Sequence, residues 1–119
     1  MSSPTGNLLD QARTALRSGN YDQAARAFAA HIRRAPAGTA TIQLLVACST
    51  DTVQKAMSEV GSAELFILPV SYKGRDCYRM AWGVYPDSAR AASAARSLPD
   101  YFRRGGASPR VMPAAEIVP

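Results

Sequence analysis

The chain has 119 residues and a mass of 12.7 kDa, enough for one ordinary domain or for a small domain with an appendage. Its 14 basic residues outnumber its 9 acidic ones, and the net charge of +5 favours anionic partners such as glycans, phosphates or membrane surfaces. One histidine and two cysteines are too few for a structural zinc site, so we expect no metal. No apolar run reaches the roughly 18 residues that a bilayer span needs, so we expect no membrane span in this chain. The N-terminus also lacks the apolar core of a signal peptide.

Two amphipathic helices are predicted near the N-terminus, after a short polar segment. Residues 1–6 contain only Ser, Pro, Thr and Gly after the methionine, and we expect them to be disordered. Apolar residues recur at helical spacing over residues 7–18 and again from Tyr21 onward, until Pro36 ends the second helix. Gly19 and Asn20 supply a tight turn, so residues 7–36 should form an antiparallel helical hairpin.

This hairpin resembles a tetratricopeptide repeat in the segment ALRSGNYDQAARAFAAHIRRAP. Gly19 lies at the turn, Tyr21 and Ala24 begin the second helix, and Phe28 would pack inward. His31 departs from the pattern, since a small alanine is usual there, and we place it on the surface or at an interface. A single repeat cannot bury its own apolar faces, so it should pack on the following domain, on another copy or on repeats outside this chain. A plain helical hairpin that serves as a cap explains the same residues.

From residue 40 onward, strands and helices are predicted in the order β-α-β-β-α-β. The strands are expected at residues 40–48, 64–72, 76–85 and 110–114, and the helices at 52–60 and 88–98. This order predicts an α+β domain, ferredoxin-like or RNP-like, over residues 40–117: a four-stranded antiparallel sheet with two helices on one face, preceded by the α-helical hairpin. The second strand would lie at an edge, where Pro69 is tolerated, and the other face of the sheet would stay open.

Alternation of side chains along the strands assigns residues to the two faces of this sheet. Because the helices must pack on an apolar face of the sheet, Gln43 of the first strand is expected on the opposite, open face. Cys77, Arg79 and Ala81 of the third strand should share that face. The residues expected to point into the core are Ile42, Leu44, Val46, Tyr78, Met80 and Trp82.

Three segments, TIQLLVACSTDTVQKAM, SYKGRDCYRMAWGVYPDSARAASAARSLP and VMPAAEI, together resemble the SPOR domain, a sporulation-related bacterial module that binds peptidoglycan. The resemblance covers about residues 40–117. It rests on the glutamine of the first strand, the third strand that ends GVY, the alanine-rich helix that ends LP and the short final strand. It implies non-catalytic binding of glycan strands stripped of their stem peptides. It also implies a place in the bacterial cell envelope or periplasm, as part of a longer exported or membrane-anchored protein that is targeted to the wall, for example in cell division.

The resemblance also implies which residues contact the glycan. Gln43 matches the family's glutamine, and Arg79 matches a position where arginine can contribute. A stripped strand offers hydroxyl, acetamido and muramic acid carboxylate groups, which suit an amide and a cation. Two positions depart from the pattern: Cys77 replaces a frequent tryptophan, and Val46 replaces a small serine. The expected glycan-binding residues are Gln43, Arg79, Cys77, Tyr72, as a substitute aromatic face, and Val111, as a rim contact.

The two cysteines form a candidate disulfide. Cys48 ends the first strand and Cys77 begins the third, and these two ends are neighbours in the predicted sheet. Strand alternation, however, places the two side chains on opposite faces. A Cys48–Cys77 disulfide and two buried free thiols therefore both remain open.

Other functions fit the sequence less well. A protein-interaction module would use the helical hairpin, a groove beside Phe28 or the edge strand. An RNA-recognition module shares the topology, but the pattern K/R-G-F/Y-G/A-F-V-x-F/Y is missing, so we expect no nucleic acid. The sole histidine lies in the hairpin, and no catalytic triad, paired carboxylates or phosphate-binding loop is evident. We therefore expect neither enzymatic activity nor a cofactor.

Overall fold

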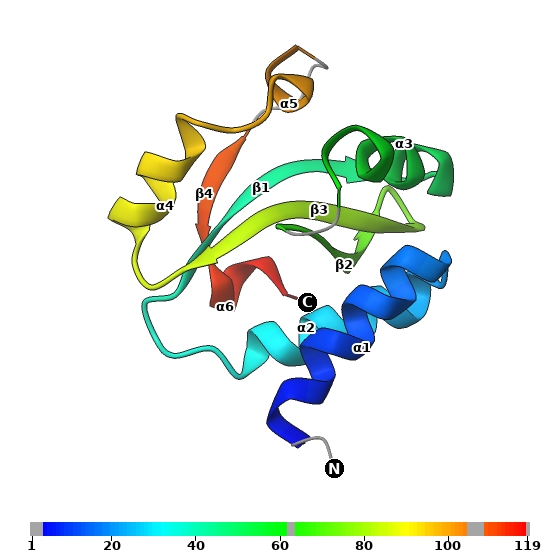
Figure 1. The fold of residues 1–119 in the computed structure, drawn as a ribbon, viewed down its shortest axis with the longest axis horizontal. Coiled ribbons are helices and arrows are strands. Elements are labelled where there is room, and N and C mark those ends of the chain that lie inside the picture. Colours follow the sequence, from blue (N-terminus) through cyan, green and yellow to red (C-terminus); the bar gives the residue numbers. More distant parts are fainter. Residues whose placement is uncertain (1–3, 62–63, 105–108, 119) are drawn as a thin grey trace.

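The computed structural model describes residues 4–61, 64–104 and 109–118 (Figure 1). The β-α-β-β-α-β order predicted after residue 40 is confirmed, and two short helices, at Asp100–Arg104 and Ala114–Ile117, were not predicted. In chain order the elements are α1 (Pro4–Ser18), α2 (Tyr21–Arg33), β1 (Ala40–Ala47), α3 (Thr50–Val60), β2 (Leu65–Tyr72), β3 (Arg75–Tyr85), α4 (Ser88–Ala95), α5 (Asp100–Arg104), β4 (Arg110–Pro113) and α6 (Ala114–Ile117).

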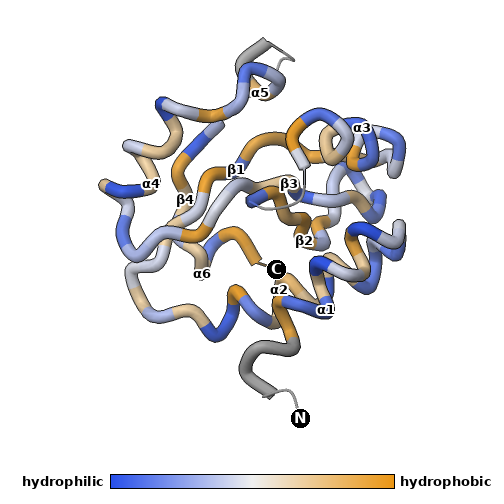
Figure 2. Tube along the Cα trace, in the orientation of Figure 1, coloured by the Kyte–Doolittle hydropathy of each residue, from blue (hydrophilic) through white to orange (hydrophobic). Residues whose placement is uncertain are grey.

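The four strands form one antiparallel sheet in the order β2-β3-β1-β4, which confirms the predicted fold class. β2 lies at an edge and pairs only with β3. Pro69 is therefore tolerated in β2, because an edge strand has one row of backbone N–H groups that no neighbouring strand needs. Figure 2 shows that hydrophobic residues are concentrated in the strands, between the surrounding helices.

Helices cover both sides of the sheet (Figure 1). On one side lie α3, α4 and α5, and there the rings of Trp82 and Phe102 are 5.9 Å apart. The α1–α2 hairpin and α6 lie on the other side, where the rings of Phe28 and Phe66 are 5.6 Å apart. The expectation of an open second face is therefore wrong. The hairpin buries its apolar face on the sheet of its own chain, the first of the three possibilities considered for it.

Small residues bring α2 close to β2. Gly19, at a φ of 86°, makes the left-handed turn between the two helices. The buried residues of α2 are Ala24, Ala25, Phe28, Ala29 and Ile32. Since three of these five are alanines, the helix backbone can approach the sheet without a layer of large side chains between them.

Three helix boundaries differ from those predicted. α1 begins at Pro4, so residues 4–6 are helical although disorder was expected for 1–6; residues 1–3 lie outside the described part. Proline is favoured at the first position of a helix, where its missing N–H needs no partner. α3 begins at Thr50 instead of residue 52, whereas α2 ends at Arg33, before Pro36, as predicted. α4 ends at Ala95 instead of residue 98, yet Leu98 is still buried, with 4% of its surface exposed.

A β-bulge at Leu44 interrupts the pairing of β1 with β3. Gln43 lies opposite Ala81 and Leu45 opposite Met80, so Leu44 is an extra residue without a partner. An extra residue reverses the alternation of the side chains that follow it. Val46, expected in the helix-facing core, consequently pairs with Arg79 on the face that carries Gln43.

A second bulge lies at Gly83, because Thr41 pairs with Val84 while Ile42 pairs with Trp82. Gly83 has a φ of 69°, a conformation that few residues with a Cβ adopt. The ring of Tyr85 lies over Gly83, and its Cζ atom would be 2.6 Å from an added Cβ. Glycine is therefore required here on both conformational and steric grounds.

Candidate functional site

Gln43 lies in a row of residues that crosses the sheet on the hairpin side. Phe66 is opposite Ala81, Ala81 is opposite Gln43, and Gln43 is opposite Arg110. Directly opposed residues of antiparallel strands project from the same face, and Phe66 contacts Phe28 of the hairpin. Gln43 is half-buried and Arg110 is exposed, so solvent reaches this end of the row.

Arg79 joins Gln43 on this face. Its Nη1 donates a hydrogen bond to Oε1 of Gln43. The side chain is half-buried, and its Nε atom is buried without a hydrogen-bond partner. Among the residues that the structure describes, Arg79 forms no ion pair with a carboxylate. An acceptor that reached this guanidinium would therefore satisfy a polar group whose burial costs about 1–3 kcal/mol.

We refer to Arg79, Gln43 and Arg110 as the polar row. It combines an amide with two guanidinium groups and extends over three adjacent strands, β3, β1 and β4. At the usual strand spacing it is about 10 Å long. The sequence brought Gln43 and Arg79 together on one face, whereas Arg110 was interpreted first as a solvated surface charge near the last strand that could touch an anionic glycan. The last strand was expected beside the first, but the register that sets Arg110 opposite Gln43 is known only from the structure.

The other predicted glycan contacts lie elsewhere. Cys77 has 3% of its surface exposed and is bonded to Cys48, so its side chain offers almost no surface for the direct contact that was expected. Val111 pairs with Ile42, one residue from Gln43 in β1, and therefore projects from the opposite face. Tyr72 is 45% exposed, but it lies six residues along β2 from Phe66, a distance of about 20 Å.

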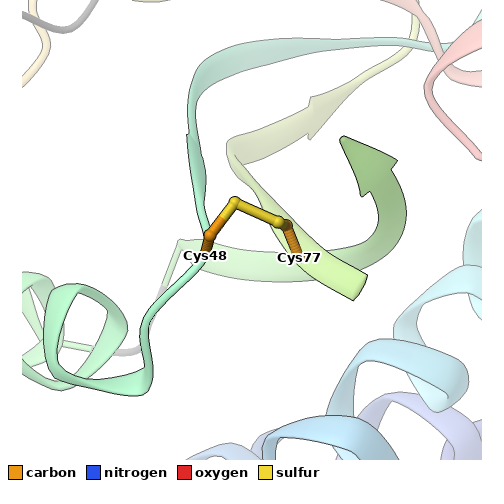
Figure 3. Close-up of a disulfide and its surroundings, with 2 residues drawn as sticks. All are labelled: Cys48 and Cys77. Atoms are coloured by element: carbon orange, nitrogen blue, oxygen red, sulfur yellow. A yellow bond between two sulfur atoms is a disulfide. The ribbon is translucent and has the colours of Figure 1, made fainter. Parts of the chain in front are cut away.

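The two cysteines form a disulfide between the end of β1 and the start of β3 (Figure 3). Their Cα atoms are 4.3 Å apart, and no free cysteine remains among the described residues. The expected obstacle, opposite faces, is absent because the bulge at Leu44 reverses the alternation before Cys48. The disulfide lies two residues from Arg79 and ties together the two strands that carry Arg79 and Gln43.

A tyrosine anchors the start of α2 to the sheet. The hydroxyl of Tyr78 donates a hydrogen bond to Oδ1 of Asp22, and the rings of Tyr78 and Tyr21 meet edge to face at 6.3 Å. Burial, followed by the hydrogen bond to Asp22, raises the pKa of Tyr78 to about 12. The hydroxyl is therefore a neutral donor at any ordinary pH.

Neither a metal centre nor a membrane span emerges from these residues. The described parts of the chain contain no cluster of three His, Cys, Asp or Glu residues that could hold a metal ion. Within the same parts, no helix is both long enough and apolar enough to cross a bilayer.

Comparison with known proteins assigns no family to the chain. No protein-family model matches the sequence, and searches of curated proteins and of solved structures find no match. The inferences about function below therefore rest on the geometry of the site and on the sequence resemblance described above.

Proposed function

We propose that this protein binds peptidoglycan glycan strands stripped of their stem peptides, without catalysing a reaction, and that the polar row is the binding site. The observation that carries the proposal is the state of Arg79. This half-buried cation is oriented by Gln43, has a buried Nε without a partner, and forms no ion pair among the described residues. A carboxylate on a ligand supplies what this guanidinium lacks.

The chemistry of a stripped glycan strand fits the row. The lactyl carboxylate of muramic acid pairs with a guanidinium in the bidentate geometry that arginine favours. The hydrogen bond from Arg79 occupies Oε1 of Gln43, so the group that Gln43 would offer to a ligand is its amide N–H₂, a donor for acetamido and hydroxyl oxygens. Arg110 adds an exposed cation on the next strand, and the length of the row suits successive sugars of an extended polymer.

The disulfide supports the same proposal with respect to location. Disulfides persist in oxidising compartments such as the bacterial periplasm, and they are rare in the cytosol. A wall-binding module in the envelope, targeting a larger protein, is consistent with the Cys48–Cys77 bond.

RNA binding is less well supported by the geometry. RNA-recognition sheets stack bases on exposed aromatic side chains of their central strands. The residues paired across the sheet at Gln43 are instead Ala81 and Arg110, and the aromatic residue opposite Ala81, Phe66, is buried with 3% of its surface exposed.

A sedimentation assay with purified sacculi tests the proposal. The protein is mixed with untreated sacculi or with sacculi from which an amidase has removed the stem peptides, and the bound fraction is titrated. We expect preferential retention on the stripped sacculi. Arg79→Ala should weaken it about tenfold or more, since a hydrogen bond to a charged group contributes about 1.5–3 kcal/mol. Gln43→Ala and Arg110→Ala should weaken it less.

Arg90→Ala is the matched control. Arg90 is an exposed arginine on α4 that pairs with Asp87 at 3.7 Å, so its loss changes the net charge equally without touching the row. Thermal unfolding of each variant verifies that the fold is retained. Equal retention on both kinds of sacculi, or unchanged retention of Arg79→Ala, would contradict the proposal.

A further inference from the structure

A second surface feature lies between the hairpin and the end of β3. It is a hollow of about 410 Å³, and none of its lining residues belongs to the polar row. Its apolar lining consists of Leu8, Ile32, Ala35, Pro36, Val84 and Pro86. A smaller hollow of about 180 Å³ shares His31, Ile32 and Val84 with it and is also lined by Phe28 and Phe66. We call the two together the hairpin groove.

The groove exposes apolar surface. Val84 is 45% exposed, and among the described residues only Tyr72 is another large apolar side chain with comparable exposure. A single exposed apolar residue needs no explanation. Val84, however, lies in a concave site beside half-buried Leu8 and the proline Pro86, and concave apolar surface is typical of binding sites.

The polar side chains around the groove are mainly basic ones. His31 and Arg34 line the larger hollow, and Arg13 lines the smaller one, where Glu64 is the acidic lining residue. The hairpin as a whole, residues 4–34, carries five arginines and two aspartates. Arg34 is exposed at the C-terminal end of α2, next to the apolar lining. Charge complementarity therefore points to an occupant that bears carboxylates.

We propose that the hairpin groove binds a short acidic peptide segment of a partner protein. Apolar side chains of the segment pack against Leu8, Ile32 and Val84, and its carboxylates accept hydrogen bonds from His31 and Arg34. This binding is independent of the glycan site. The protein thus joins a glycan polymer, held on one part of its surface, to a partner protein held on another.

Selection from a phage-displayed library of random short peptides tests this inference, with the full chain immobilised as bait. We expect the selected peptides to be enriched in Asp and Glu beside apolar residues. The affinity of a selected synthetic peptide, measured by fluorescence anisotropy, should fall as salt is raised, because charged groups contribute to binding. Val84→Glu should weaken that affinity about tenfold or more, since it replaces an apolar contact with a negative charge that repels the carboxylates of the peptide.

Matched variants separate the groove from general effects. Arg34→Glu should also weaken peptide binding, and it reports on the groove even if Val84→Glu disturbs the end of β3. Tyr72→Glu and Arg90→Glu make comparable changes at distant exposed residues and should leave the peptide affinity within about twofold of wild type.

Three results would overturn the inference: a library that yields no binder, selected peptides that are not enriched in acidic residues, or a peptide affinity that neither Val84→Glu nor Arg34→Glu lowers. The sacculus assay distinguishes this outcome from failure of the proposed glycan site, because Val84→Glu should retain wild-type binding to stripped sacculi.

Discussion

Removing the Cys48–Cys77 disulfide should destabilise the protein substantially. The two cysteines are separated by 29 residues, and cross-linking a loop of this length restricts the unfolded chain by about 3.6 kcal/mol in free energy. At about 2.1 cal/mol/K per residue, a chain of 119 residues unfolds with an entropy near 0.25 kcal/mol/K. The free energy divided by the unfolding entropy predicts that the melting temperature falls by about 14 °C when the disulfide is removed.

Thermal unfolding followed by circular dichroism, with and without reductant, measures this change. The Cys48→Ala/Cys77→Ala variant without reductant should melt near the reduced wild type, because both lack the cross-link. Thiol titration of the unfolded, unreduced protein should detect no free thiol, which verifies the starting state. A reduced protein that melts within about 2 °C of the oxidised one would refute the loop-entropy reasoning.

Three further perturbations test the packing of the hairpin and the sheet. Phe28→Ala removes the ring that contacts Phe66 and should cost about 3–5 kcal/mol in urea unfolding; a loss under about 1 kcal/mol would contradict the docking of the hairpin. Gly83→Ala should cost at least about 1–2 kcal/mol because φ is 69°, and an unchanged midpoint would argue against the bulge. The pKa of Tyr78 rises from 10.0 to about 12, so the folded state holds this proton more tightly and stability should fall as pH rises from 10 toward 12. Tyr78→Phe, which also loses the bond to Asp22, should lack that part of the pH dependence; an identical slope would refute the assignment.

The order of the four strands and of the longer helices could be predicted because these elements differ in hydrophobic pattern and in the turn residues that separate them. Bulges could not be predicted in this way, because a bulge does not show in the composition or the hydrophobic pattern of a strand. It nevertheless reverses the face to which every later side chain of that strand points. The bulge at Leu44 is the reason why alternation assigned Val46 to the wrong face and set Cys48 apart from Cys77.

The position of the α1–α2 hairpin on the second face of the sheet depends on contacts between residues far apart in the sequence. The hydrophobic periodicity of each element contains no information about such contacts. Phe28 was identified as an inward-facing residue, but its contact, Phe66, lies 38 positions away in β2. The helices α5 and α6 are five and four residues long, too short to show a helical period. Of the candidate site, Gln43 and Arg79 were found because Gln43 precedes the bulge at Leu44 and the pairing of β3 is regular around Arg79, so alternation still assigns both to one face.

The most direct test of the glycan proposal is nuclear magnetic resonance of the ¹⁵N-labelled protein titrated with stripped peptidoglycan fragments. Chitin oligomers, which lack the lactyl carboxylate, are the matched ligand. We predict that the stripped fragments shift the side-chain signals of Arg79 Nε and Gln43 Nε2, and that the chitin oligomers do so far more weakly. If neither ligand shifts these two signals, or both shift them equally, the polar row does not recognise the carboxylate of the glycan.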